Sequence, residues 1–390
     1  MSIRRVFFWA HLVAGVAAGL VIVFLSVTGV LLTYERQIIA WAEKGSLALP
    51  AEAGAPLSTD ALATVAEQIG KGAATSLVLR DDPAAPVTVR TGRSNTTLVD
   101  PYSGVVLEDG AAGVRAFFDY VTRLHRWFAM EGVARETAAA ITGAANLVFL
   151  FILGSGIVLW WPKKWKWRLV RMNLVFRRGL PNAKARDYNW HHVFGIWALI
   201  PLIVVVATAV VFSYPWANRA VYAAFGEEVP VRSGPPGAAP LANQSQGDAR
   251  MDGNPAGQQL QAIVDDAKLR LPEWRSITLS LPDAAAPVEL RVDSGTGGQP
   301  TRQTTLTYAA DDAQLVSERG FVDESPATRA RMLIRFLHTG EALGIIGQTI
   351  AGLASLASVI LAYTGLALAW RRLVTPLLRK RRVELDRRQG

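Results

Sequence analysis

Residues 7–34 of the chain read FFWAHLVAGVAAGLVIVFLSVTGVLLTY, a run without a charged side chain. A helix of about 20 consecutive apolar residues is long enough to cross the hydrocarbon core of a bilayer. Three later stretches, 137–161, 188–214 and 344–370, also lack charged residues. The sequence therefore predicts a membrane protein built on an all-α bundle of four transmembrane helices.

The composition of the 390-residue chain agrees with this prediction, because 51% of the residues are hydrophobic and only 19% are charged. Soluble domains carry about 25% charged residues. The chain has no cysteine, which excludes disulfide scaffolds, thiol nucleophiles, cysteine-ligated iron–sulfur clusters and covalently attached c-type haem. Other side chains would have to hold any redox cofactor, and the five histidines are the candidates.

The basic residues predict the orientation. The N-terminus 1–6, the loop 162–187 and the tail 371–390 hold 19 of the 41 Lys and Arg residues but only three acidic residues. By the positive-inside rule these segments are cytoplasmic. We therefore expect a bacterial inner-membrane protein with both termini in the cytoplasm and the long segments 35–136 and 215–343 in the periplasm. Four tryptophans interleave with the lysines at one end of the loop, which is typical of an anchor at lipid headgroups and not of a nucleic-acid site: Trp160, Trp161, Trp165 and Trp167.

The two halves of the sequence resemble each other. The first span opens with HLVAG at 11–15 and the third with HHVFG at 191–195, and a threonine follows each first histidine by 17 residues. Each long segment starts with a helical pattern, continues with strand-like alternations and ends in Leu-His: 57–69, 75–79, 87–90, 97–107 and 124–125 in the first half, and 258–269, 276–281, 288–292, 304–316 and 337–338 in the second. We predict a parallel internal duplication with two periplasmic α+β modules, the second interrupted by a flexible linker at 233–257.

Four histidines occupy equivalent places in the two halves. His11 and His191 lie near the cytoplasmic ends of the first and third spans, and His125 and His338 come shortly before the second and fourth spans. Each face of the membrane therefore receives one pair, with one member from each half. Ionisable groups in a bilayer are costly and mark function, and two neutral imidazoles without a nearby cysteine or carboxylate are typical of bis-histidine ligation of haem iron.

The spacing around the inner pair supports a flat cofactor. Gly15 and Gly195 each follow their histidine by four residues, on the same helix face, where a missing side chain leaves room for a porphyrin. His191 and His192 are about 100° apart on a helix, so only one can face a given iron. The glycine spacing favours His191, and His192 is the alternative.

Three arginines lie close in sequence to the outer pair, namely Arg123, Arg126 and Arg335. Their guanidinium groups are candidates for pairing with haem propionates, and contact with lipid headgroups is the alternative. The sequence thus predicts two b-type haems whose irons are ligated by His11, His191, His125 and His338.

The chain resembles the PepSY-associated transmembrane proteins and, within that family, the bacterial inner-membrane ferric-siderophore reductases of the ferrioxamine reductase type. The resemblance covers essentially the whole chain. It rests on the H-x-x-x-G openings at His11 and His191, LHR at 124–126, FLHTG at 336–340 and LVDPYSGVVL at 98–107, which looks like the PepSY signature. The corresponding stretch 308–316 lacks the proline and glycine of that signature.

The resemblance implies that two b-type haems pass electrons outward to a ferric siderophore and that its iron is released as Fe(II). The electron donor would be a separate quinol or flavoprotein. The alternative is a non-redox PepSY membrane protein that acts as a regulatory or peptidase-interaction module. A proton-relay transporter would need charged residues in the spans and a zinc hydrolase a third ligand, and the spans offer neither.

Overall fold

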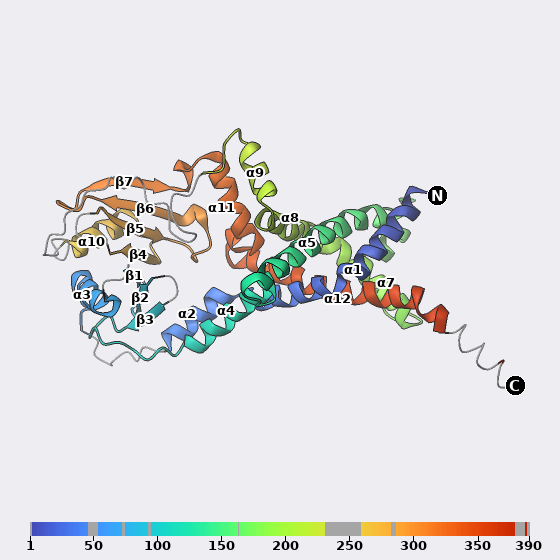
Figure 1. Ribbon diagram of the computed structural model, residues 1–390, viewed down its shortest axis with the longest axis horizontal. Helices are drawn as coiled ribbons and strands as arrows, with labels where there is room; N and C mark the ends of the chain where they lie inside the picture. Colours follow the sequence, from blue (N-terminus) through green and yellow to red (C-terminus); the bar gives the residue numbers. More distant parts are fainter. Residues whose placement is uncertain are drawn as a thin grey trace. The chain divides into compact units, whose positions relative to one another are not determined.

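The computed structural model describes residues 2–45, 54–71, 75–92, 95–162, 164–230, 259–281, 286–378 and 387. The predicted linker 233–257 lies outside the described residues, as does most of the basic tail. The chain divides into two compact units (Figure 1). The helical unit comprises Met1–Glu35, Phe118–Asn218 and Leu337–Gly390, and the sheet unit comprises Arg36–Phe117 and Arg219–Phe336.

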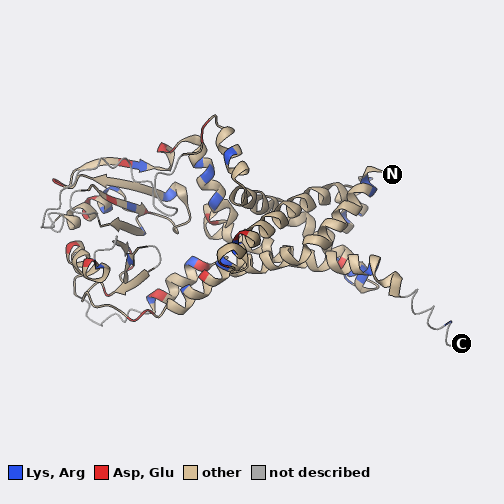
Figure 2. Ribbon diagram, viewed as in Figure 1, with Lys and Arg blue, Asp and Glu red and all other residues tan. Residues whose placement is uncertain are grey.

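Long apolar helices form the helical unit. They are α1 (Ile3–Leu31), α5 (Gly132–Trp160) and α12 (Gly344–Leu373), and each belongs to a helical stretch long and apolar enough to cross a membrane. A fourth span is possible if the consecutive helices α7 (Ala183–Trp197) and α8 (Leu199–Ser213) are counted together. Figure 2 shows that the middle parts of these helices carry no charged residue. The chain is a membrane protein with three or four helices apolar enough to span.

The third predicted span, 188–214, is not one continuous helix. Its two parts, α7 and α8, are bent by 67° at Ala198. Pro201 lies in the first turn of α8, where its missing N–H costs nothing, but in a continuous helix its ring would clash with the carbonyl of Trp197. Pro201 is therefore a local cause of the bend. A count of apolar residues does not reveal it.

Small residues let the spanning helices pack closely. Gly19 of α1 lies against Leu366 of α12, where an added Cβ would come within 3.1 Å of the leucine side chain. The Ser26 hydroxyl of α1 donates to the Ser358 hydroxyl of α12 over 2.8 Å, and the Asn146 amide of α5 donates to the Val206 carbonyl of α8 over 3.1 Å. Such packing and interhelical hydrogen bonds stabilise helix association in a bilayer, where apolar burial between helices contributes little.

The sheet unit is built on one seven-stranded antiparallel sheet of order β3-β2-β1-β4-β5-β6-β7. Its strands are β1 (Thr75–Arg80), β2 (Val87–Thr91), β3 (Asn95–Val99), β4 (Ser276–Ser280), β5 (Val288–Asp293), β6 (Gln303–Tyr308) and β7 (Leu315–Gly320). Two helices, α3 (Thr59–Gly70) and α10 (Leu260–Arg270), pack on one face of it over a buried core that includes Leu77, Leu279, Leu290 and Leu306. Shorter helices complete the two units: α2 (Glu35–Lys44), α4 (Ala112–Trp127), α6 (Trp167–Leu174), α9 (Pro215–Ala223) and α11 (Pro326–His338).

The two predicted α+β modules share this sheet. Strand β1 of the first half pairs with β4 of the second, with Leu77 opposite Leu279. Pairing two edge strands satisfies backbone groups that separate modules would leave exposed. The predicted strand at 97–107 is shorter than expected, because β3 ends at Val99 and only Val106 rejoins it as an isolated bridge.

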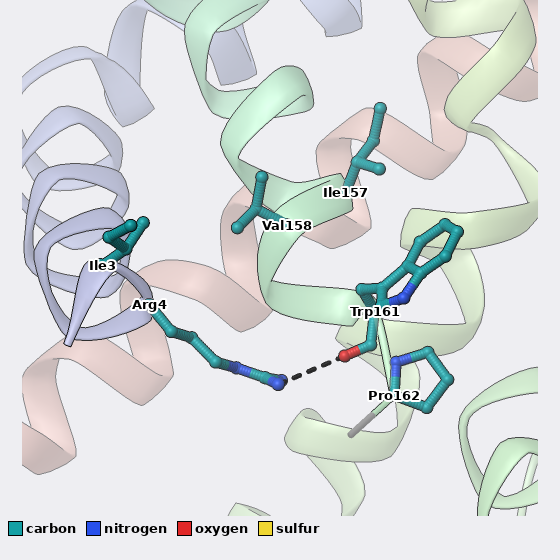
Figure 3. Close-up of a pocket in the computed structure, with 6 residues that line it drawn as sticks. All are labelled: Ile3, Arg4, Ile157, Val158, Trp161 and Pro162. Atoms are coloured by element: carbon teal, nitrogen blue, oxygen red, sulfur yellow. Dashed lines mark hydrogen bonds between the residues drawn. The ribbon is translucent and has the colours of Figure 1, made fainter. Parts of the chain in front are cut away.

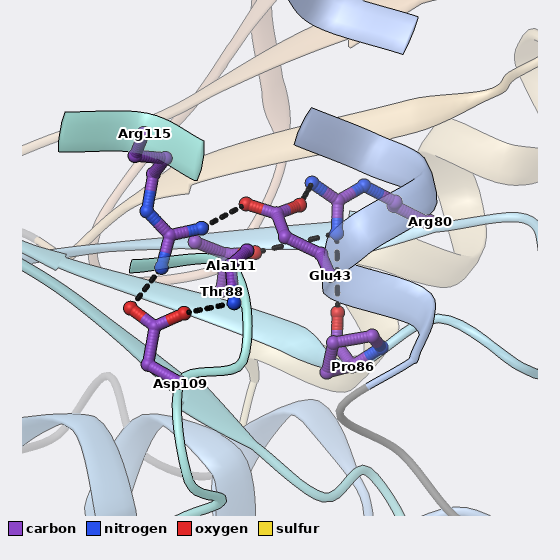
Figure 4. Close-up of polar contacts among 7 residues, drawn as sticks. All are labelled: Glu43, Arg80, Pro86, Thr88, Asp109, Ala111 and Arg115. Atoms are coloured by element: carbon purple, nitrogen blue, oxygen red, sulfur yellow. Dashed lines mark hydrogen bonds and ion pairs between the residues drawn. The ribbon is translucent and has the colours of Figure 1, made fainter. Parts of the chain in front are cut away.

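A buried carboxylate ties the first half of the sheet unit together (Figure 4). Glu43 of α2 is 4% exposed and accepts from Arg80 over 2.6 Å and from Arg115 over 2.7 Å. Arg115 also pairs with Asp109. A buried charge is tolerated only when it is paired in this way, so Glu43 fixes the positions of α2, β1 and the start of α4.

Candidate functional site

The structure brings His11 of α1 and His191 of α7 together in the helical unit. Their ring centres are 6.4 Å apart and the ring planes are nearly perpendicular, at 86°. The Nδ1 atom of His11 lies 2.8 Å from the Ser155 hydroxyl of α5, and that of His191 lies 3.0 Å from the Thr364 hydroxyl of α12. Four helices of the helical unit, α1, α5, α7 and α12, therefore hold this inner pair.

The second pair has the same construction. His125, near the end of α4, and His338, at the end of α11, have ring centres 6.5 Å apart and planes inclined at 55°. The Nδ1 atom of His125 lies 2.8 Å from the Thr28 hydroxyl of α1. That of His338 lies 2.9 Å from the Val205 carbonyl and 3.3 Å from the Thr208 hydroxyl, both on α8.

The hydrogen bonds define the tautomer of each ring. The hydroxyls of Thr28, Ser155 and Thr364 each donate their proton to a carbonyl of their own helix, so they accept from the imidazole. The Val205 carbonyl can only accept. The proton of each neutral ring therefore lies on Nδ1, and the lone pair of Nε2 remains available. Histidines that ligate metals are oriented in this way by an acceptor at the other ring nitrogen.

The spacing within each pair fits one metal ion between two imidazoles. A metal–imidazole bond is about 2.0–2.1 Å long and the ring centre lies roughly 1.1 Å behind the nitrogen, so two opposed ligands have ring centres about 6.3 Å apart. The observed separations are 6.4 and 6.5 Å. Among the described residues, no group of three or more His, Cys, Asp or Glu side chains is placed to hold a metal ion.

Glycines flank the rings. A Cβ added at Gly15 would meet nothing within 4 Å, and one at Gly195 would meet only Leu361, at 3.7 Å. Closer to the rings lie Gly29, Gly156 and Gly365, whose added Cβ atoms would approach His125, His11 and His191 at 3.7, 3.7 and 3.2 Å. Gly15 follows His11 by four residues on α1, so the open space beside it is compatible with the flat cofactor that the sequence predicts.

The fifth histidine is placed differently. The ring that faces His11 belongs to His191, and His192 lies beside it with a ring-centre distance of 6.3 Å. His192 packs on Tyr188, at 4.1 Å between ring centres, and its Nδ1 lies 2.9 Å from the Tyr188 carbonyl.

The three arginines proposed as propionate partners make other contacts. Arg123 forms ion pairs with Asp119 and Glu131, at 3.1 and 3.6 Å. The guanidinium of Arg126 lies over the Trp127 ring at 4.6 Å, and that of Arg335 over the Phe336 ring at 5.4 Å. Their pairing with propionates stays a prediction.

The hydroxyl partners are the residues for which sequence reasoning assigned no role. Three of the four stand in a hydroxyl-glycine dipeptide, Thr28-Gly29, Ser155-Gly156 and Thr364-Gly365, and the fourth stands in Thr208-Ala209. A hydroxyl followed by a small residue within a spanning helix was the signal available. In such a dipeptide the hydroxyl can accept a hydrogen bond from the histidine, and the small residue next to it leaves room for the imidazole ring.

An apolar pocket of about 460 Å³ lies where the start of α1 meets the end of α5 (Figure 3). The Arg4 guanidinium beside it donates to the carbonyls of Leu159 and Trp161 over 2.6 and 3.2 Å. The last carbonyls of a helix have no partner within it, and a cation there is favourable. Arg4 thus stabilises the end of the helix that carries Ser155.

The comparison with known protein families bears on the whole chain. No curated protein matches the sequence. The family model for the PepSY-associated TM region matches residues 8–372. The matched range contains both histidine pairs, their four hydroxyl partners and the described strands of the sheet unit. The chain therefore belongs to the family of PepSY-associated transmembrane proteins.

Proposed function

We propose that this protein is a di-haem b-type electron-transfer protein of the bacterial inner membrane. It carries electrons from the cytoplasmic side to a ferric siderophore in the periplasm, where reduction releases the iron as Fe(II). One observation carries the proposal: both histidine pairs have the separation of two ligands on one metal, at 6.4 and 6.5 Å, and each ring keeps Nε2 free.

When bound, haem supplies a one-electron Fe(III)/Fe(II) couple. The chain's own residues hold and orient it. The hydroxyl and carbonyl acceptors keep each Nδ1 protonated and each ring in place. His11 and Thr28, which contacts His125, are 17 residues apart on α1, or about 25 Å along the helix axis. Two sites at that spacing divide a hydrophobic barrier of about 30 Å.

A parallel duplication accounts for the way the pairs are supported. Each histidine hydrogen-bonds to a hydroxyl of its own half, as in His11–Ser155 and His191–Thr364. Each histidine then faces a ring from the other half. This arrangement supports a pseudo-two-fold relation between halves that run in the same direction through the membrane.

The test is haem content per chain, measured by the pyridine haemochrome assay on purified protein. We expect about two haems b in the wild type. His11→Ala and His191→Ala should each lose one haem, as should His125→Ala and His338→Ala, while the other haem is kept. His192→Ala is the matched control and should keep both.

A folded, colourless wild type would overturn the proposal and leave the non-redox regulatory or peptidase-interaction module, which needs no cofactor. Loss of a haem from His192→Ala but not from His191→Ala would reassign the inner ligand. The acceptor is tested separately in proteoliposomes that contain an internal reductant. Ferric siderophore added outside should yield Fe(II), detected by a colorimetric ferrous chelator, and the double variant His125→Ala/His338→Ala should not produce it.

A further inference from the structure

A second pocket, of about 350 Å³, lies between α6, the start of α7 and the chain that joins them. The residues that line it include the apolar Met172 and Leu180, the basic Arg177 and Lys184, and Tyr188. This size is within the range of pockets that bind small molecules, about 300–1,000 Å³. The pocket belongs to the basic 162–187 segment and the helix that follows it.

Two asparagines give this pocket a fixed frame. The buried Asn189 accepts from the Arg177 backbone N–H over 3.0 Å and donates to the carbonyls of Met172 and Val175 over 3.0 and 3.1 Å. Asn182 caps the start of α7 by accepting from the Ala185 N–H over 2.9 Å. Both amides therefore serve the backbone, which holds the connection between α6 and α7 in one shape.

The charged side chains of the pocket are not used in this way. In the part of the chain that the structure describes, neither Arg177 nor Lys184 has an ion-pair or side-chain hydrogen-bond partner, and no acidic side chain lines the pocket. The nearest acid in sequence, Asp187, is fully buried and is paired with Arg186 and Arg371 at 2.9 and 2.5 Å. The pocket thus presents two uncompensated positive charges, which favour an anion.

A chain of aromatic rings leads from the pocket to the inner histidine pair. The ring of Tyr188, a residue that lines the pocket, lies 4.1 Å from the ring of His192, and the two planes are inclined at only 34°. The His192 ring centre lies 6.3 Å from that of His191. The ring centres of Tyr188 and His191 are therefore no further apart than the sum of the two distances, 10.4 Å.

From these observations we infer that this pocket binds the electron donor, and that the donor is a planar aromatic molecule carrying a phosphate, of the chemical class of flavin mononucleotide. The ring system packs against Tyr188 between Met172 and Leu180, and the phosphate pairs with Arg177 and Lys184. The role of the ligand rests on the proposed function, but its binding does not.

The electron balance is simple. Each reduced donor gives up two electrons and two protons. The electrons reduce two substrate Fe(III) ions to Fe(II), and the protons pass to water at the face of the membrane where the pocket opens.

Flavin mononucleotide itself is the probe, titrated into the full-length protein in nanodiscs of neutral lipid while its fluorescence is recorded. We expect saturable quenching in the wild type. The double variant Arg177→Ala/Lys184→Ala should weaken binding at least about tenfold, since two charge-assisted contacts are lost. The control Lys166→Ala/Arg168→Ala removes the same charge from the same loop outside the pocket and should bind as the wild type does.

Two further measurements distinguish the contacts of the phosphate from the contacts of the aromatic ring system. Lumiflavin, which lacks the phosphate, should bind more weakly and be insensitive to the double variant, whereas Tyr188→Leu should weaken both flavins. Because a lipid headgroup also offers a phosphate, the titration is repeated in nanodiscs with anionic lipid. If the affinity for flavin mononucleotide in anionic nanodiscs is within twofold of that in neutral nanodiscs, the pocket binds the soluble donor and not a lipid headgroup.

Three results would overturn the proposal: no saturable quenching in the wild type, equal affinity in the double variant, or loss of flavin binding whenever anionic lipid is present. The same titration is run on His11→Ala/His191→Ala protein. Flavin binding that persists when the inner haem is lost, or haem content that persists when flavin binding is lost, distinguishes failure of one proposal from failure of the other.

Discussion

The histidine pairs of the helical unit and the Glu43 cluster of the sheet unit (Glu43, Arg80 and Arg115) make different kinds of polar contact. Around the histidines of the helical unit the pairs are neutral, an imidazole with a hydroxyl or a carbonyl, as for His11 with Ser155 at 2.8 Å. In the sheet unit the buried pair is ionic, with Glu43 between Arg80 and Arg115 at 2.6 and 2.7 Å (Figure 4). Both arrangements satisfy hydrogen-bonding groups away from water.

The difference bears on the proposed function. An ion pair holds a backbone firmly, but it uses the ligating atoms of both partners. A neutral imidazole that donates through Nδ1 is oriented just as firmly and keeps a free lone pair on Nε2. The Glu43 cluster therefore fixes the shape of the sheet unit, while in the proposed function the partly buried histidines of the helical unit remain available for a ligand.

The largest effect should come from breaking the ionic arrangement. Glu43→Gln leaves Arg80 and Arg115 without their shared carboxylate, and removing one partner of a buried ion pair costs about 3–5 kcal/mol. We expect faster hydrogen exchange across β1, β2 and α2, with haem content unchanged. Glu108→Gln, at an exposed acid of the same unit, should change stability by less than about 0.5 kcal/mol. A loss of haem in Glu43→Gln would mean that the two units are not independent.

Breaking the neutral arrangement should act on the cofactor. Ser155→Ala, Thr28→Val and Thr364→Val each remove the hydroxyl acceptor at one Nδ1, and such losses cost about 10–100-fold in metal affinity. Thr208→Val should cost less, because His338 also donates to the Val205 carbonyl at 2.9 Å. The rate of haem dissociation from each variant, measured by transfer of haem to apomyoglobin, ranks the four substitutions. Equal rates in Thr28→Val and Thr208→Val would show that the carbonyl does not compensate.

A smaller effect should follow from crowding one ring. The Cβ of Gly365→Ala would lie 3.2 Å from His191 Cε1, so the ring must shift by a few tenths of an ångström. The Cβ of Gly29→Ala would lie at 3.7 Å from His125, an ordinary contact. We expect the first variant to alter the low-spin electron paramagnetic resonance signal of the inner haem and the second to leave the outer signal unchanged. The reverse result would contradict the ring positions.

Much of this arrangement could be predicted from the sequence, because it depends on patterns that repeat. Charge-free runs predicted where the long apolar helices lie, although α5 starts at Gly132 and not at residue 137, and α7 starts at Ala183 and not at residue 188. Equivalent positions in the two halves led to the pairs His11–His191 and His125–His338, and the structure brings the same rings together. Periodicity and repetition are properties of the chain itself, so they can be read without coordinates.

The remaining features depend on contacts between distant segments. Strands β1 and β4 pair and so join the strands of the two halves into one sheet. The alternation of apolar and polar residues in each strand does not reveal this pairing. The roles of Ser155 and Thr364 require knowing which helices neighbour α1 and α7. The break at Ala198 is a different case. Pro201 is visible in the sequence, but the length of the apolar run favoured the prediction of one continuous helix.

The smallest effect we expect is a pH dependence confined to the sheet unit. The Arg270 guanidinium, through its hydrogen bond to Asp266, lowers the pKa of that carboxyl below its usual 3.8, and the Tyr308 hydroxyl adds to this. A lowered folded-state pKa contributes stability that is present above pH 3.8 and is lost as the pH falls through the folded value. For a partly exposed pair the contribution is below about 1 kcal/mol. Asp266→Asn should therefore speed hydrogen exchange of α10 slightly at pH 7, and the difference from the wild type should vanish once the pH lies below the folded-state pKa of the Asp266 carboxyl. A difference that persists in acid would mean that Asp266 acts through packing and not through its charge.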